Sequence, residues 1–166
     1  MLQKDFAPYE PSLALKELGF DEPCLAFWDA YNGGTHLLFK QRIEYHWLLR
    51  LFGKKPEPVL EISNEEIEYL EGDGVILAPT FSQAFRFFRE KYGLRNSITD
   101  FIDDETGIEW DYEIAIIGTD LDEKGNYKPL VDYSVDDETR KFKTYEEAEL
   151  GCLLKLIEIV KEKKNG

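Results

Sequence analysis

Residues 143–164 read Lys-Thr-Tyr-Glu-Glu-Ala-Glu-Leu-Gly-Cys-Leu-Leu-Lys-Leu-Ile-Glu-Ile-Val-Lys-Glu-Lys-Lys, and this stretch decides the fold. The Thr144 hydroxyl can accept the backbone N–H of Glu147, while the Glu147 side chain can reach back to the N–H of Thr144; this reciprocal pattern is a capping box. Phe142 and Ala148 are placed to form a hydrophobic staple across the same start. Lysines at the far end suit the negative pole of a helix dipole. The stretch therefore predicts a long helix that begins at Thr144.

The apolar face of this predicted helix is unusually wide. It spans about 200°, more than the stripe of an ordinary surface helix. One sheet cannot cover so wide a face, so either a second helix lies alongside or part of the face, with Leu154 at its edge, meets another chain. We favour a neighbouring core within the same chain. The apolar positions are Tyr145, Ala148, Leu150, Cys152, Leu153, Leu156, Ile157, Ile159 and Val160.

A second helix start has the same pattern. Residues 80–84 read Thr-Phe-Ser-Gln-Ala and residues 144–148 read Thr-Tyr-Glu-Glu-Ala, so both place a threonine cap three residues before Gln or Glu. Gly93 is expected to end the earlier helix, whose buried face would carry Phe85, Phe88 and Tyr92. Each helix follows residues typical of strands. We therefore predict an α+β fold in which both helices pack on one face of a joint, mainly antiparallel sheet, with two similar β-rich units each closed by a helix as one arrangement.

Two hairpins and a short helix complete the expected elements. Residues 24–28 and 35–39 flank an Asn-Gly-Gly turn, and residues 97–102 and 109–117 flank an acidic turn at 103–107. In the second hairpin, alternation places Trp110, Tyr112, Ile114 and Ile116 in the core and Asp111, Glu113 and Ala115 in water. The remaining expectations are a helix from Pro11 or Ser12 to Gly19, strands at 59–62, 75–77 and 129–133, an amphipathic turn at 64–70, and a polar excursion at 119–128. Residues 40–55 fit a strand or a helix, and we favour a strand.

Composition limits the class of protein. The 166 residues, 43% of them hydrophobic, suit a single domain over 1–166, and the absence of a signal sequence or a long apolar run predicts a cytoplasmic protein. The net charge of -14 makes direct nucleic-acid binding unfavourable, because such binding depends on lysine and arginine at phosphates. Cys24 and Cys152 lack a partner pattern and are expected to be buried thiols. Oligomeric state stays open, and no cofactor is expected.

Candidate catalytic groups are few. The acidic turn carries Asp100, Asp103, Asp104 and Glu105, which would hold a divalent ion if the hairpin brought them together; acidic hairpin tips are also common for solubility alone, and we favour that interpretation. Residues 120–125 open like a calcium loop, but a lysine and a valine stand at positions that need oxygen ligands. His36 and His46 lie outside any catalytic motif. An enzyme is therefore disfavoured.

Two resemblances bear on origin. The order helix, hairpin, strand, helix over residues 79–164 is similar to the double-stranded RNA-binding domain, but acidic residues stand where that family places phosphate-binding lysines, so the resemblance implies topology and not function. Residues 18–26, 78–93 and 144–158 resemble small uncharacterised proteins encoded by phages and mobile elements of gut Bacteroidetes. That family has no assigned activity and implies an accessory role.

Acidic and basic residues are unevenly distributed along the sequence, and this distribution suggests a function. The interval between Arg95 and Lys124 contains no lysine or arginine, and residues 56–85 are also acidic and free of both. Such a surface suits a basic protein partner. We expect a non-enzymatic interaction protein of phage or mobile-element type, and the alternative is a divalent-metal-dependent enzyme that uses the acidic hairpin. The acidic residues of the interval are Asp100, Asp103, Asp104, Glu105, Glu109, Asp111, Glu113, Asp120, Asp122 and Glu123.

Overall fold

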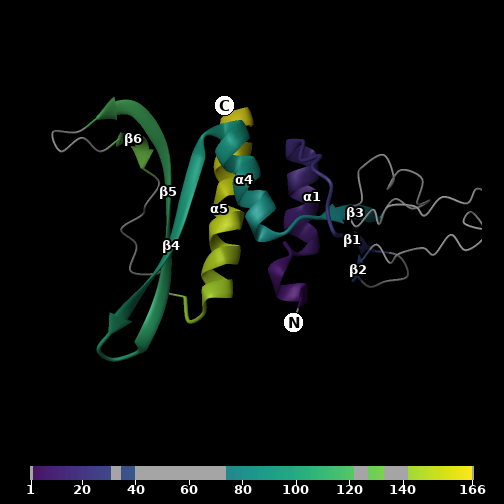
Figure 1. Ribbon diagram of the computed structural model, residues 1–166, viewed down its shortest axis with the longest axis horizontal. Helices are drawn as coiled ribbons and strands as arrows, with labels where there is room; N and C mark the ends of the chain where they lie inside the picture. Colours follow the sequence, from purple (N-terminus) through teal and green to yellow (C-terminus); the bar gives the residue numbers. More distant parts are fainter. Residues whose placement is uncertain (1, 31–34, 40–73, 122–126, 133–141, 166) are drawn as a thin grey trace, which may run out of the picture. The chain divides into compact units, whose positions relative to one another are not determined.

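The chain has an α+β fold, as predicted, with two antiparallel three-stranded sheets (Figure 1). The structure, a computed structural model, describes residues 2–30, 35–39, 74–121, 127–132 and 142–165. The chain divides into two compact units: the first is Pro8–Thr80, and the second combines Met1–Ala7 with Phe81–Gly166. The expected joint sheet is therefore two separate sheets, one in each unit. The single domain over 1–166 stays a prediction.

The first unit contains one helix and a small sheet. Its elements are α1 (Tyr9–Leu18), β1 (Ala26–Asp29), β2 (His36–Phe39) and β3 (Val75–Ala78). β1 lies in the middle and pairs antiparallel with both neighbours, so that Ala26 stands opposite Phe39 on β2 and Ala78 on β3. The predicted hairpin of residues 24–28 and 35–39 is confirmed.

The start of α1 differs from the prediction. The helix begins at Tyr9 with Pro8 as its cap residue, one turn before Ser12, and the Ser12 N–H donates to the Pro8 carbonyl at 2.9 Å. Pro11 is tolerated inside this first turn because the N–H groups there have no acceptor within the helix. The predicted end is confirmed, since Gly19 adopts the left-handed conformation (φ 87°).

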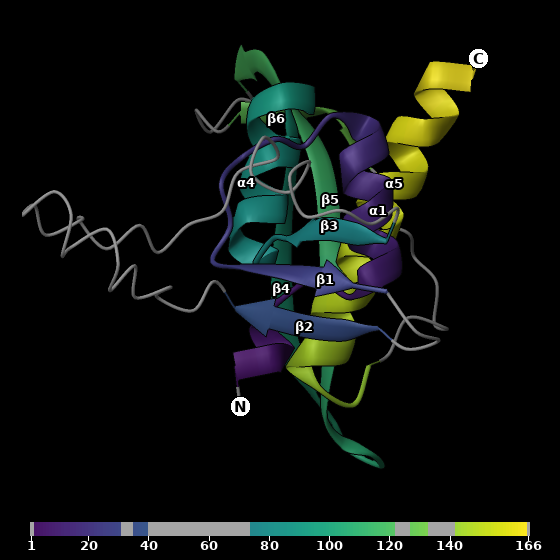
Figure 2. The same cartoon turned by 90° about the vertical axis from the view of Figure 1, so that its right-hand side faces the viewer.

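The second unit places two helices on one sheet. Its elements are η1 (Leu2–Asp5), α4 (Phe81–Tyr92), β4 (Leu94–Asp103), β5 (Gly107–Leu121), β6 (Tyr127–Asp132) and α5 (Tyr145–Asn165), and the strand order is β4-β5-β6. α4 and α5 lie side by side on the same face of the β4–β5 pair (Figures 1 and 2). The prediction that a second helix accompanies α5 within the chain is confirmed. Both helices that were predicted to begin with a threonine cap belong to this one unit, whereas the sequence pattern suggested one for each unit.

The long hairpin β4–β5 is the main structural feature of the second unit. Its register runs from Leu94 opposite Ile116 to Asp103 opposite Gly107. Tyr112 and Ile114 are buried, as the alternation predicted. The predicted edge strand is confirmed as β6, where Pro129 is tolerated because an edge position can lack a donor. The polar excursion is shorter than expected, because β5 continues to Leu121 and β6 begins at Tyr127.

The buried face of α4 is rotated from the one expected. Phe81, Phe87 and Phe88 are buried, whereas Phe85 and Tyr92 are only half-buried. The Phe87 ring packs edge-on against Phe88 (centroids 5.4 Å apart) and Tyr92 (5.6 Å). Gly93, with φ 68°, ends the helix as predicted. The helical period of the apolar residues could not identify the buried face of α4, because aromatic residues occur on several sides of this helix.

The start of α5 confirms the threonine cap and corrects its details. The Glu147 N–H donates to the Thr144 hydroxyl at 3.2 Å, but the Glu147 carboxylate accepts the N–H of Lys143 at 3.1 Å, where the sequence predicted that of Thr144. Phe142 was expected to staple onto Ala148. Its ring lies over Gly151, and the staple itself stays a prediction.

Several expectations fall outside the described residues. These are the strand favoured for residues 40–55, the strand at 59–62, the turn at 64–70, the environment of His46, and the calcium-like loop from residue 122 onward.

Candidate interaction surface

The β4–β5 hairpin extends past the start of α5, as Figures 1 and 2 show. At the start of α5 the Trp110 ring packs edge-on against Tyr145, with centroids 5.2 Å apart. Trp110 also exchanges two backbone hydrogen bonds with Phe142, of 2.8 and 3.0 Å. We call residues 100–110 the hairpin tip. Its base is therefore fixed to the segment that enters α5.

Beyond Trp110, on the same face, the hairpin tip exposes two large apolar side chains, while Phe101, which is 37% exposed, lies on the other face. Ile102 is 80% exposed and Ile108 is 60% exposed. The two residues stand directly opposite each other, so their side chains share one face of the sheet and are close enough to touch. Since Ile108 and Trp110 are two residues apart on β5, this is the same face on which α5 packs. The pair continues the apolar face of the sheet into solvent.

Carboxylates surround this apolar pair. Asp100 is opposite Trp110 on the same face, and Asp104 and Glu105 lie in the turn; all three are exposed. Asp103 has a structural task instead, because its Oδ1 accepts the N–H groups of Glu105 (2.9 Å) and Thr106 (3.0 Å). This Asx arrangement shapes the turn.

The four candidate metal ligands do not converge in the structure. Asp100 and Asp103 are three residues apart on a strand and so belong to opposite faces. Among the described residues, no three His, Cys, Asp or Glu side chains are grouped so that they could hold a metal ion. The geometry therefore gives the metal hypothesis no support in this part of the chain.

The other face of the hairpin carries a row of acidic residues on β5. Glu113 is exposed and accepts a hydrogen bond from the Ser97 hydroxyl at 3.4 Å, while Asp111 is half-buried. Glu109 differs from the expected wet pattern: it is only 8% exposed, stands opposite Phe101, and accepts a hydrogen bond from the Thr106 hydroxyl. Carboxylates thus occur on both faces of the hairpin.

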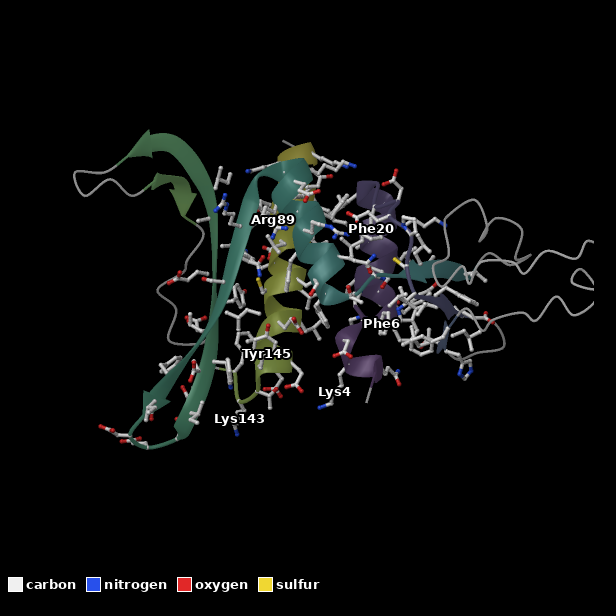
Figure 3. The ribbon with its side chains drawn as sticks, viewed as in Figure 1. Lys4, Phe6, Phe20, Arg89, Lys143 and Tyr145 are labelled. Atoms are coloured by element: carbon white, nitrogen blue, oxygen red, sulfur yellow. The ribbon has the colours of Figure 1, made fainter. Side chains whose placement is uncertain are left out.

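A second charged group lies at the start of α5. Lys4 forms an ion pair with Glu146 (3.2 Å), and the Tyr145 hydroxyl donates to Glu149 at 3.5 Å; Figure 3 labels Lys4, Lys143 and Tyr145 in this region. Burial, with smaller contributions from the nearby carboxylates of Asp5 and Glu146 and against the opposing effect of the Tyr145 hydrogen bond, raises the pKa of Glu149 to about 7. Glu149 therefore titrates near neutral pH.

Charge and burial also shift the pKa values of Glu146 and Tyr145, which lie close to Glu149 on α5. The pKa of Glu146 is lowered by backbone hydrogen bonding at the helix start and by Lys4. Burial, with the adjacent Glu149, raises the pKa of Tyr145. The start of α5 thus holds Glu146, whose lowered pKa favours the charged form, and Glu149, whose raised pKa disfavours it.

The structure also places both cysteines and one of the two histidines. Cys24 and Cys152 are buried thiols, as predicted, and the Cys24 thiol donates to the Glu22 carbonyl at 3.4 Å. His36 is exposed at one end of β2. No helix in the described part of the chain is long and apolar enough to cross a membrane.

Comparison of the chain with protein-family models, curated proteins and solved structures gives no match in any of the three. The candidate site therefore rests on the geometry alone. Sequence reasoning identified the acidic turn but not the exposure of Ile102, which was placed at the end of a predicted strand, or of Ile108, which lay between the turn and the next predicted strand. No local pattern could have revealed this exposure, because it depends on where α5 begins along the hairpin.

Proposed function

We propose that this protein is a non-enzymatic interaction protein that binds a basic protein partner through the acidic β4–β5 hairpin. One observation carries the proposal: the hairpin presents exposed carboxylates at its tip and at Glu113 on β5, in an interval with no lysine or arginine between Arg95 and Lys124. Opposite charge on a partner would steer the encounter, and salt would weaken it.

The charged groups of the tip are available for a partner. Asp100, Asp104 and Glu105 form no ion pair with a described lysine or arginine. Because they lie in water, a partner cation can approach them without displacing a described lysine or arginine. An accessory role in a phage or mobile element is part of the proposal and rests on the resemblance of residues 78–93 and 144–158.

The proposal is tested by pull-down from a Bacteroidetes lysate at low and high salt. The test variant is Asp100→Asn/Asp104→Asn/Glu105→Gln. The control removes the same charge elsewhere, through Asp21→Asn/Glu90→Gln/Glu162→Gln, all at exposed positions. We expect a protein partner that the wild type and the control retain at low salt, and that the test variant loses. A partner retained equally by both variants would contradict the proposal.

The second candidate function is a divalent-metal-dependent enzyme at the same hairpin, and its motivating observation is the density of carboxylates in residues 100–105. A thermal-shift screen with Mg²⁺, Mn²⁺ and Ca²⁺ separates the two. We expect no shift, since the carboxylates do not converge. A clear shift that Asp103→Asn/Asp104→Asn abolishes would favour the enzyme.

A further inference from the structure

We infer that the hairpin tip is the recognition element, and that it binds a cationic protein segment in which an apolar side chain is flanked by lysine or arginine. This inference rests on the proposed function and names the chemistry of the partner. It starts from the exposed pair Ile102 and Ile108, which an interaction based on charge alone would not need.

The apolar pair is large enough to contribute to binding. At 80% and 60% exposure, the two side chains leave most of their apolar surface in water, although they stand opposite each other on the face that α5 covers further along the hairpin. Burying such surface against a partner is favourable. Exposed apolar residues that form a contiguous pair, rimmed by polar groups, are typical of interaction sites.

The carboxylates around Ile102 and Ile108 favour a positively charged partner. Along β4, Asp100 lies two residues from Ile102 on the same face, and beyond the pair the turn carries Asp104 and Glu105. An apolar side chain seated on Ile102 and Ile108 would therefore have carboxylates on either side of it. Lysine or arginine next to that apolar residue would complement them.

The same charges argue against a second copy of this chain as the occupant. A symmetric contact would place each hairpin tip against its equivalent, so that Asp100, Asp104 and Glu105 would meet their own counterparts. The chain carries a net charge of -14, and no lysine or arginine lies between Arg95 and Lys124 to relieve the repulsion. A cationic segment from another protein has no such conflict.

The tip is preorganised for binding. The β4–β5 pairing continues without a break to Asp103 opposite Gly107, and the Asp103 carboxylate holds the turn through two backbone N–H groups. Its base is fixed by the backbone bridge between Trp110 and Phe142. Less conformational entropy is lost on binding when the surface is already ordered.

The test uses labelled short peptides and fluorescence anisotropy at low salt. One peptide alternates lysine with leucine, a second lysine with serine, and a third glutamate with leucine. The test variant is Ile102→Ser/Ile108→Ser, whose positions are exposed enough for the fold to tolerate the change. The control is Leu154→Ser on α5, another large apolar residue, 49% exposed and away from the tip.

We expect the lysine–leucine peptide to bind the wild type and Leu154→Ser alike, and to bind the isoleucine variant at least about tenfold more weakly. In wild-type protein labelled at isoleucine methyl groups, the NMR signals of Ile102 and Ile108 should shift on adding that peptide. The glutamate–leucine peptide should not bind. Equal affinity of the lysine–leucine peptide for the wild type and the isoleucine variant, or no binding at all, would overturn the inference.

The outcomes also separate this inference from the proposed function. If cationic peptides bind in a way that needs Asp100, Asp104 and Glu105 but not the isoleucines, the inference fails and the proposed function stands. If Asp100→Asn/Asp104→Asn/Glu105→Gln leaves their affinity unchanged, both fail. Sedimentation that shows a wild-type dimer, lost in Ile102→Ser/Ile108→Ser, would assign the tip to self-association and overturn the choice of partner.

Discussion

Replacing Gly151 with alanine should destabilise the protein, although the residue lies within α5. A glycine inside a helix costs about 1 kcal/mol relative to alanine, so helix propensity alone predicts a gain in stability. At Gly151, however, a Cβ atom would lie 2.7 and 3.0 Å from two ring atoms of Phe142 and 3.3 Å from the Tyr112 ring. Carbon atoms in contact normally stay about 3.5–4.0 Å apart, so something must move.

The Phe142 ring has little room to withdraw. Its backbone exchanges hydrogen bonds with Trp110 in both directions, and its ring lies 5.9 Å from that of Tyr112. Overpacking of this kind costs about 1–3 kcal/mol. Set against the propensity gain of about 1 kcal/mol, Gly151→Ala should leave stability unchanged at best and lower it by up to about 2 kcal/mol.

Urea denaturation of four proteins tests this account: the wild type, Gly151→Ala, Phe142→Leu and the double variant. Phe142→Leu removes the ring that crowds position 151, so in its background Gly151→Ala should raise the free energy of unfolding by about 1 kcal/mol. The sign of the alanine effect therefore reverses between the two backgrounds. A Gly151→Ala single variant clearly more stable than the wild type would refute the reasoning.

Three further effects can be measured by denaturation. Thr144→Ala removes the hydroxyl that accepts the Glu147 N–H and should cost about 1 kcal/mol, and Thr80→Ala should cost a similar amount at the start of α4; unchanged midpoints in both would mean that the caps contribute nothing. Asp103→Ala removes the acceptor of two turn N–H groups and should cost about 1 kcal/mol, with Asp104→Ala, next to it, as the neutral control. The pKa of Glu149 is about 7 in the folded protein, above the ordinary 4.5, so the carboxyl is harder to ionise when the protein is folded. This difference does not affect the free energy of unfolding well below pH 4.5, and it lowers that free energy increasingly as pH rises from 4.5 to 7. Glu149→Gln should therefore match the wild type near pH 4 and exceed it at pH 8 by on the order of 1 kcal/mol after allowance for solvent screening; an equal difference at both pH values would contradict this.

Local signals along the chain determined most of the elements. The threonine cap of α5, the glycines that end α1 and α4, and the acidic turn of the β4–β5 hairpin all act within a few residues of themselves. Such interactions need no partner from elsewhere in the chain, so sequence reasoning placed them correctly. The α+β class follows from those elements.

The tertiary structure decided which part of the β4–β5 hairpin is covered by a helix and which part is exposed. The sequence of β4 and β5 alternates in the same way at Tyr112, which is buried, and at Ile108, which is exposed, because alternation states only which face a side chain is on. Whether that face meets a helix depends on where α5 begins along the hairpin, and this is fixed by the contact of Trp110 with Tyr145 and by the backbone bridge between Trp110 and Phe142. Those contacts join residues far apart in the chain, and no local pattern encodes them. The sequence alone therefore determined the hairpin and its charge, while tertiary packing decided that its tip extends, apolar and acidic, beyond the helices.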